Sequence, residues 1–235
     1  MEPLITGNMC ETETFRNVYM TTCEIIDLAA IKTTPVQPSP FPYSIISNVL
    51  SNEFLPKIQQ DFPPIEDAGS FPLTTVQYGG YFAKLIDELK SDAFRQVIAE
   101  KFAMDLANKP VMITVRGKAD HTDGRIHTDS KSKLITVLLY MNEDWQLDGG
   151  RLRLLNDNHN LENYFAEVPP TAGTMLLFKV TENGWHGHKK FIGARKVLQL
   201  NYVINEAALN KHAMRHSFSA KFKEWRRRLF GKKFS

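Results

Sequence analysis

Cysteine is scarce in this chain of 235 residues, which contains only Cys10 and Cys23. Two cysteines near one end exclude a disulfide framework and a metal site built from several cysteines. A run of about 18 apolar residues, the length that a membrane-spanning helix needs, is also missing. The first residues are polar and acidic, and they lack the basic and apolar layout of a signal peptide. We therefore expect a cytoplasmic protein.

A strong charge of one sign is missing from most of the sequence. The formal net charge is +3, but residues 211–235 carry nine Lys or Arg against one Glu, so this segment holds +8 and the remainder −5. A mildly acidic body with one basic appendage is not typical of a general nucleic-acid binder. We therefore expect no nucleic-acid partner.

The basic C-terminal tail, which we assign to residues 206–235, also carries an apolar stripe. Its members recur at helical spacing among the basic residues: Phe218, Phe222, Trp225 and Leu229. This pattern predicts an amphipathic helix. Such a helix suits a peripheral contact between residues 211–235 and an anionic surface at the inner face of a membrane. A helix docked on the protein's own core explains the pattern equally well, and both interpretations stay open.

The length and the hydrophobic content predict one folded core with attachments. We place an N-terminal segment with a proline-rich linker at residues 1–42, and one globular domain at residues 43–205. Within this domain, residues 43–108 are predicted to form helical support and residues 109–205 a β-rich core.

Local patterns give the predicted elements. A strand is expected at 43–49, and amphipathic helices are expected at 51–61 with a polar cap at its start, at 80–89, and at 92–102 with Ser91 as its cap. From residue 109 the pattern becomes strand-like, with segments at 111–115, 134–140, 149–155, 173–180 and 195–203. Short strands separated by turn signals indicate a compact antiparallel sandwich or barrel.

One strand organises the candidate site. Residues 134–140 are aliphatic and β-branched, as in a strand that is buried on both faces, and His127-Thr-Asp129 lies at its entry. In extended chain, side chains two apart point the same way, so His127 and Asp129 would face one point. A second copy, His121-Thr-Asp123, lies upstream, but the turn signal Asp123-Gly124 separates it from the strand. We therefore prefer the later copy.

A third metal ligand is offered by a turn that contains His186 and His188. Two His and one carboxylate form a facial triad, which leaves open positions on Fe(II). Arg195 follows His186 by nine residues and shares a strand face with Val197, Gln199 and Asn201. An Arg on such a face needs a partner if it is buried. This partner is either a structural Asp or Glu or the carboxylate of a dicarboxylate cosubstrate.

These motifs, taken in order, resemble a known family. The set consists of His127-Thr-Asp129, Tyr140-Met-Asn142, Asp148-Gly-Gly150, Pro169-Pro170 with Gly173, His186 and Arg195. It is similar to the Fe(II)/2-oxoglutarate-dependent dioxygenases, in particular to their prolyl 4-hydroxylase-like branch. The similarity spans about residues 40–205 and is most specific at 125–203. It implies a mainly β fold with N-terminal helices and a double-stranded β-helix, or jelly-roll, core.

The resemblance also implies roles for individual residues. His127, Asp129 and His186 would bind Fe(2+), since the spacing to Arg195 selects His186 over His188. Arg195, helped by the Tyr140 hydroxyl, would bind the C5 carboxylate of 2-oxoglutarate. The other residues that would line the cosubstrate pocket are Thr136, Leu138 and Gln199. Gln199 departs from the pattern of animal prolyl hydroxylases, in which a small hydroxyl residue is usual. The implied cofactors are Fe(2+), 2-oxoglutarate and O2, with ascorbate as an optional reductant.

The activity that the resemblance implies is hydroxylation of a C–H bond with release of succinate and CO2. A peptidyl proline, an amino acid or a glycan would each serve as the substrate. The alternative is a cupin-like metal-binding protein without oxygenase activity, such as a Zn hydrolase or a pseudoenzyme. Arg195 and Tyr140 discriminate between the two, because a hydrolase has no need of them.

Overall fold

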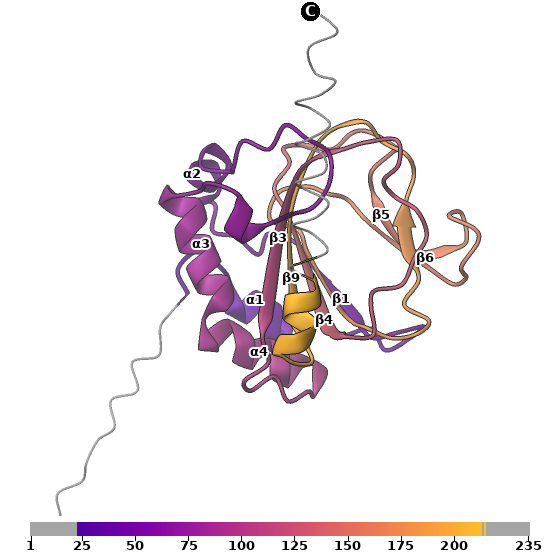
Figure 1. Ribbon diagram of the computed structural model, residues 1–235, viewed down its shortest axis with the longest axis horizontal. Helices are drawn as coiled ribbons and strands as arrows, with labels where there is room; N and C mark the ends of the chain where they lie inside the picture. Colours follow the sequence, from indigo (N-terminus) through magenta and orange to yellow (C-terminus); the bar gives the residue numbers. More distant parts are fainter. Residues whose placement is uncertain (1–22, 213, 215–235) are drawn as a thin grey trace, which may run out of the picture.

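The computed structural model describes residues 23–212 and 214, and it has two β-sheets with helices on the outer side of the larger one (Figure 1). The larger sheet has the strand order β1-β7-β4-β9-β3-β2 and the smaller sheet has the order β6-β5-β8. All pairings within the two sheets are antiparallel. The strands are β1 Tyr43–Ile46, β2 Phe71–Pro72, β3 Val111–Ala119, β4 Lys133–Tyr140, β5 Leu152–Leu155, β6 Tyr164–Val168, β7 Met175–Lys179, β8 His186–His188 and β9 Gly193–Val203.

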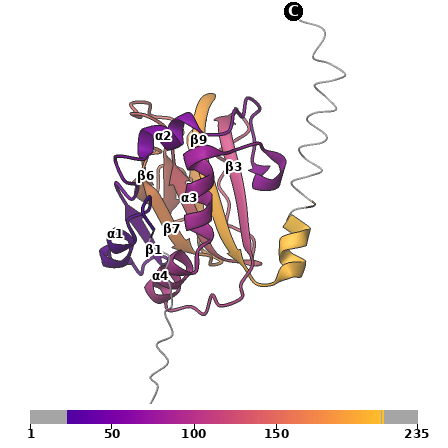
Figure 2. The ribbon, with the colours of Figure 1, turned by 90° about the vertical axis from the view of Figure 1, so that its left-hand side faces the viewer.

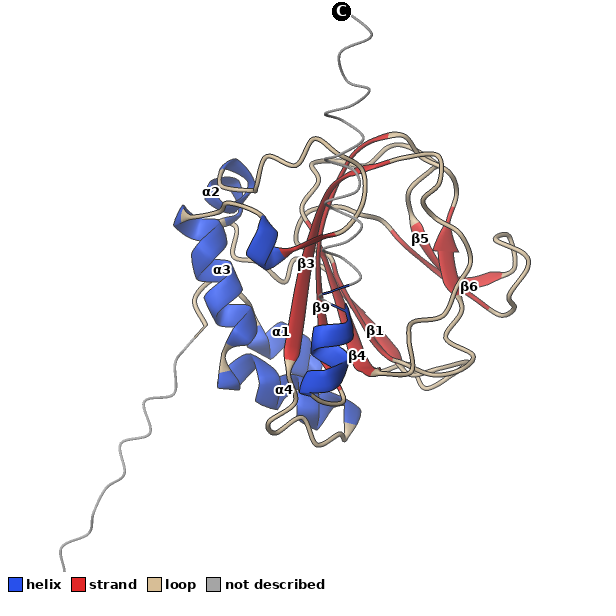
Figure 3. Ribbon diagram, viewed as in Figure 1, coloured by secondary structure: helices blue, strands red, loops and turns tan. Residues whose placement is uncertain are grey.

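The helices cover one face of the larger sheet, and the smaller sheet faces the other side (Figures 2 and 3). They are α1 Leu28–Thr33, α2 Leu55–Gln60, α3 Gly80–Lys90 and α4 Asp92–Phe102, with a 3-10 turn at Leu73–Thr75. This arrangement confirms the predicted fold class, a mainly β protein with N-terminal helices and a jelly-roll core.

Strand β4 shows why the core divides into two parts. Ile135, Val137 and Leu139 are fully buried in the cluster that packs against the helices. Tyr140, two positions after Leu138 on the opposite face, belongs to a second cluster between the sheets. Because the side chains of a strand alternate, one strand supplies both clusters. The prediction of a strand buried on both faces is thus confirmed.

The predicted helices at 80–89 and 92–102 are confirmed as α3 and α4, and the Ser91 hydroxyl caps α4 by accepting from Phe94 N at 3.1 Å. The capped helix predicted at 51–61 is wrong in its start. Helix α2 begins at Leu55 and has no side-chain cap. Pro56 explains the difference, because proline lacks an N–H and fits the first turn of a helix.

The folded core reaches further toward the N-terminus than the predicted boundary at residue 43. Ile25, Ile26 and Ile31 are buried with the helices, and the Glu88 carboxylate accepts hydrogen bonds from the N–H groups of residues 24–26 at 2.8–3.1 Å. Phe41, which we placed in the linker, is 1% exposed and packs between the sheets. The described part of the segment 1–42 therefore packs with the domain.

The predicted strands of the β-rich core are all present, with shifted ends. Strands β2 and β6 were not predicted, and β8 (His186–His188) lies where the sequence predicted a turn with these two histidines. Residues 206–212 are helical, and His212 is hydrogen-bonded to Ser132 at 2.8 Å. The apolar stripe of the tail lies outside the described residues, so both interpretations of it stay predictions. Among the described helices, none is long and apolar enough to cross a membrane.

Candidate active site

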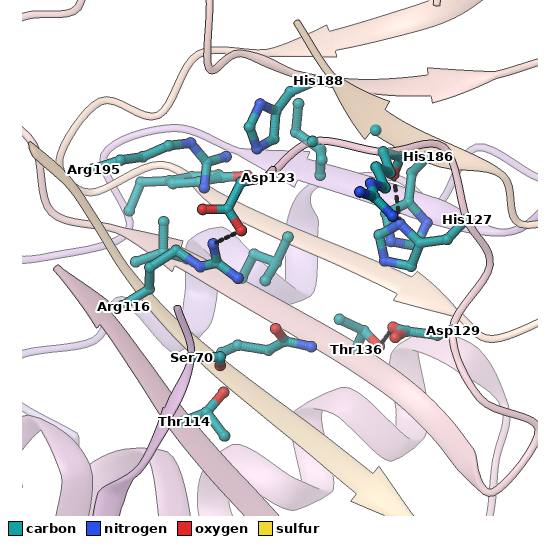
Figure 4. A pocket seen from close by; sticks show the side chains of 18 of the residues that line it. Ser70, Thr114, Arg116, Asp123, His127, Asp129, Thr136, His186, His188 and Arg195 are labelled. Atoms are coloured by element: carbon teal, nitrogen blue, oxygen red, sulfur yellow. Dashed lines mark hydrogen bonds and ion pairs between the residues drawn. The ribbon is translucent and has the colours of Figure 1, made fainter. Parts of the chain in front are cut away.

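A cavity of about 370 Å³ lies between the two sheets. Its floor is the inner face of β3, β4, β7 and β9, and its other walls come from β5, β8 and the loop that leads from β3 to β4 (Figure 4). Every residue that we predicted for the site lines this cavity: His127, Asp129, Thr136, Leu138, Tyr140, His186, Arg195 and Gln199.

The two histidines of the predicted triad are held together by backbone pairing. His127 and His186 form an antiparallel bridge in which each N–H donates to the other residue's carbonyl at 3.0 Å. Their rings lie with centroids 4.3 Å apart. The Nδ1 atoms of His127 and His186 lie 2.9 Å from the carbonyls of Arg125 and Gly184 respectively. A carbonyl can only accept, so both Nδ1 atoms donate and both Nε2 atoms keep a lone pair, as a metal requires.

Asp129 completes the cluster. One potential ligand atom from each of His127, Asp129 and His186 lies within 4.8 Å of the others. The Asp129 Oδ1 is 2.6 Å from the Lys133 ammonium, and its Oδ2 accepts from the Thr136 hydroxyl at 2.5 Å. These two partners fix the carboxylate, because both of its oxygens are engaged.

Electrostatics set the charge of the cluster at neutral pH. Burial lowers the pKa of His186 to about 4, with a further contribution from His127, so this imidazole is neutral and able to bind a metal. Burial alone would raise the pKa of Asp129, but the Lys133 ammonium, with hydrogen bonds from Lys133 and Thr136, holds it below its usual range. Asp129 is therefore a carboxylate.

The upstream copy of the motif lies apart from this cluster. His121 is exposed and its ring contacts Asp120, whereas the Asp123 carboxylate forms an ion pair with Arg116 at 2.6 Å. Gly124, with φ at +87°, makes the turn between the two copies. A Cβ there would lie 2.3 Å from the His188 carbonyl, so only glycine allows this close approach.

Arg195 and Tyr140 add two polar groups to the lining of the cavity, apart from the ligand cluster. Arg195 is 5% exposed and donates from Nε to the Gly150 carbonyl at 2.8 Å, and its guanidinium carbon lies 5.5 Å from the centre of the Tyr140 ring. In the part of the chain that the structure describes, no acidic side chain forms an ion pair with Arg195, and the buried Tyr140 hydroxyl has no hydrogen-bond partner. A structural Asp or Glu is therefore not the partner of Arg195 among these residues.

Burial raises the pKa of Tyr140, so its hydroxyl remains a donor at neutral pH. Together with the N–H groups of Arg195 that do not bind the Gly150 carbonyl, it offers several donors to one space. Buried donors of this kind are costly unless an acceptor meets them. A carboxylate fits both groups.

The remaining predicted residues connect the two parts of the cavity. Thr136 donates to Asp129 and accepts from Asn201 at 2.8 Å, and Asn201 in turn accepts from Gln199 at 3.1 Å. Leu138 lies opposite Gln199 in the register of β4 and β9. A chain of hydrogen bonds thus runs from the predicted ligand Asp129 across the cavity floor.

Sequence reasoning missed five charged or titratable residues that line the same cavity, namely Arg116, Asp123, Arg125, Lys133 and His188. His188 lies beside Arg195 in Figure 4, and burial, followed by the field of Arg195, lowers its pKa to about 4. Arg116 and Asp123 lie on the β3 side of the cavity. The strand pattern of β3 could have indicated Arg116, because alternation from Thr114 places both on one face. Its pairing with Asp123 has no signal in the sequence.

Comparisons with known proteins agree with this geometry. Residues 113–203 match the model of the 2OG-Fe(II) oxygenase superfamily. No curated protein sequence matches the chain. A prolyl-4-hydroxylase from Pseudomonas putida is similar in structure, with a TM-score of 0.52, 19% identity, and coverage of 76% of this chain and 98% of that one. A 2OG-Fe(II) oxygenase family oxidoreductase from Burkholderia pseudomallei has a TM-score of 0.51, 12% identity, and coverage of 77% and 92%.

The predicted enzyme class, a 2-oxoglutarate-dependent oxygenase, is confirmed by the match of residues 113–203 to this superfamily model. The fold is that of the prolyl 4-hydroxylase-like members. The family implies Fe(2+), 2-oxoglutarate and O2, as predicted, whereas ascorbate remains a prediction.

Proposed function

We propose that this oxygenase hydroxylates a C–H bond of its substrate and releases succinate and CO2, with His127, Asp129 and His186 as the iron ligands. The observation that carries the proposal is the pair Arg195 and Tyr140, whose donors face the same cavity as the three ligand atoms. When bound, Fe(II) and 2-oxoglutarate supply the oxidising chemistry: O2 gives one oxygen atom to succinate and the other to the C–H bond, while the cosubstrate loses CO2.

The donor set fits Fe(II). Two neutral imidazoles and one carboxylate bind a divalent iron and leave adjacent positions free. The hydrogen bonds of His127 and His186 to backbone carbonyls fix the tautomer, and Lys133 and Thr136 orient Asp129. Side chains and carbonyls that orient ligands in this way raise metal affinity by roughly 10- to 100-fold.

Arg195 and Tyr140 would hold the far carboxylate of 2-oxoglutarate. A guanidinium binds a carboxylate through parallel N–H groups, and each charged hydrogen bond contributes roughly 1.5–3 kcal/mol. Thr136, Leu138 and Gln199 would line the space between this carboxylate and the iron. Such an arrangement favours a dicarboxylate cosubstrate and gives no advantage to a zinc hydrolase, so it supports the oxygenase over the cupin-like alternative.

The test of the proposal is turnover of 2-oxoglutarate without added substrate. We expect the purified protein to form succinate slowly, because 2-oxoglutarate can be oxidised without hydroxylation of a substrate. This reaction should require both Fe(II) and O2. Succinate is measured with Fe(II), with Zn(II) in its place, and under anaerobic conditions. Equal succinate formation in all three samples would contradict the proposal.

The duplicated His-x-Asp motif gives a second prediction. His121→Ala should keep the iron content of the wild type, because His121 is exposed and is not among the residues that line the cavity. His127→Ala should lose most of its iron. Metal content after reconstitution with Fe(II) decides between the two copies. Loss of iron from the His121 variant alone would reverse the assignment.

A further inference from the structure

The charges that line the cavity do not balance once the iron and the cosubstrate are counted. The charged lining residues are Arg116, Asp123, Arg125, Asp129, Lys133 and Arg195, so four cations face two anions. The histidines count as neutral here. On the proposed function, the +2 of Fe(II) and the −2 of 2-oxoglutarate cancel. A net charge of +2 therefore remains for the substrate, and a partly enclosed cavity with such an excess favours an anion.

Arg116 is the cation best placed to meet this anion. Arg116 is on β3, and β9 lies between β3 and β4 in the sheet. Strand β4 carries Lys133 and Thr136, the residues that orient Asp129. Its side chain is 25% exposed, so a molecule that enters the cavity can reach it. Within residues 23–212, its one ion-pair partner is Asp123, and this contact occupies Nη1 only. The rest of the guanidinium fork is free to bind a second carboxylate.

The backbone of β3 is built to present this side chain. Arg116 lies on the same face of β3 as Met112 and Thr114, which also line the cavity, and the register shift between Arg116 and Lys118 places its extra residue in β9. A Cβ at the intervening Gly117 would lie 2.5 Å from the Ile65 carbonyl, so glycine is required there. Strand alternation therefore directs Arg116 into the cavity (Figure 4).

Asp123 fixes the direction of the guanidinium. Its Oδ1 forms the ion pair with Arg116, and its Oδ2 accepts from Asp120 N at 2.8 Å, within a turn closed by Asp123 N and the Asp120 carbonyl at 2.9 Å. Both carboxylate oxygens are thus engaged. The first His-x-Asp copy therefore supplies a positioning residue in place of a metal ligand.

We propose that the substrate carries a carboxylate and that Arg116 binds it, with Asp123 as the positioning residue. This inference rests on the proposed function, because it assigns to the substrate the charge that iron and cosubstrate leave uncompensated. The carboxylate belongs either to a free amino acid or to the acidic side chain of a peptide. In both cases the guanidinium would bind the same group, a carboxylate.

The experiment compares pairs of probes that differ only in this charge. Free L-amino acids are paired with their amides, and N-acetyl amides of Asp and Glu are paired with those of Asn and Gln. Succinate release and the shift of the Fe(II)/2-oxoglutarate absorption band are measured for each probe at 10 mM, which is about the upper limit of practical screening. We expect at least one acid to exceed its amide by about 10-fold or more, as the loss of one charged hydrogen bond predicts.

Variants separate this role from cosubstrate binding. Arg116→Gln should bind 2-oxoglutarate like the wild type, by the absorption band, while the preference for the acid falls to about one. Arg116→Lys should retain part of the preference, and Asp123→Asn should weaken it while Fe(II) and 2-oxoglutarate still bind. His121→Ala, an exposed residue of the same loop, serves as the matched control and should behave like the wild type.

Three results would overturn the inference. One is an amide that acts as strongly as its acid, and another is a panel in which no acid changes the absorption band. The third is a loss of 2-oxoglutarate affinity in Arg116→Gln as large as in an Arg195 variant, since Arg116 would then belong to the cosubstrate site. A wild-type protein that forms no Fe(II)/2-oxoglutarate complex is a separate result, because it contradicts the proposed function itself.

Discussion

Replacing Asp129 with Ala is expected to abolish the visible absorption band of the Fe(II)/2-oxoglutarate complex. Asp129 is the one anionic member of the ligand cluster. Groups that only orient a ligand contribute roughly 10- to 100-fold to metal affinity, so loss of the ligand itself should weaken iron binding by more than about 100-fold. The band and the bound iron are measured anaerobically on the same sample.

The same change also affects the fold, which has to be separated from the effect on iron. The Lys133 side chain is 11% exposed, and without Asp129 its ammonium loses its partner. Removing one member of a buried ion pair costs about 3–5 kcal/mol. Asp129→Asn keeps the size of the side chain and tests whether folding is responsible, and Asp144→Ala, an exposed Asp, is the control. A wild-type band in both Asp129 variants would disprove the ligand assignment.

Replacing Arg195 with Met should have the second large effect, this time on the cosubstrate. Two charged hydrogen bonds at roughly 1.5–3 kcal/mol each correspond to a loss of at least about 100-fold in affinity for 2-oxoglutarate. Iron binding should persist, because Arg195 is not a member of the ligand cluster. Met matches the length of the buried stem, so the cavity wall stays filled.

Thermal unfolding provides the measurement for this variant. A ligand that binds only the folded state raises its stability in proportion to the logarithm of its concentration over its Kd. With Fe(II) under anaerobic conditions, millimolar 2-oxoglutarate should raise the Tm of the wild type and leave that of Arg195→Met unchanged. Equal shifts in the two proteins would show that the cosubstrate binds elsewhere.

Much of the β-rich core could be predicted because its strands carry an unambiguous pattern. Residues 134–140 are apolar on both faces, and the described strand β4 adds only Lys133. Strand β2 has two residues, one of them Pro72, and β6 begins with the exposed Tyr164, so neither has a continuous apolar signal. The packing of Ile25 and Phe41 depends on distant partners, which explains why the domain boundary was placed too late.

In the candidate site, too, residues placed by local spacing could be predicted and contacts between distant residues could not. His127 and Asp129 are two residues apart at a strand entry, and Arg195 begins the alternating face of a strand, so local spacing is enough to place them. The bridge between His127 and His186 joins residues that are 59 positions apart, and only the ordered set of motifs suggested it. The Arg116–Asp123 pair joins β3 to the turn that precedes Gly124, and no local pattern specifies this contact.

The most direct test of the central claim is an anaerobic titration of the wild-type protein, loaded with Fe(II), with 2-oxoglutarate. A site made by His127, Asp129, His186 and Arg195 predicts a visible charge-transfer band that saturates at one equivalent of 2-oxoglutarate per chain and does not form with Zn(II). An iron-loaded protein that develops no band at saturating 2-oxoglutarate would contradict the account.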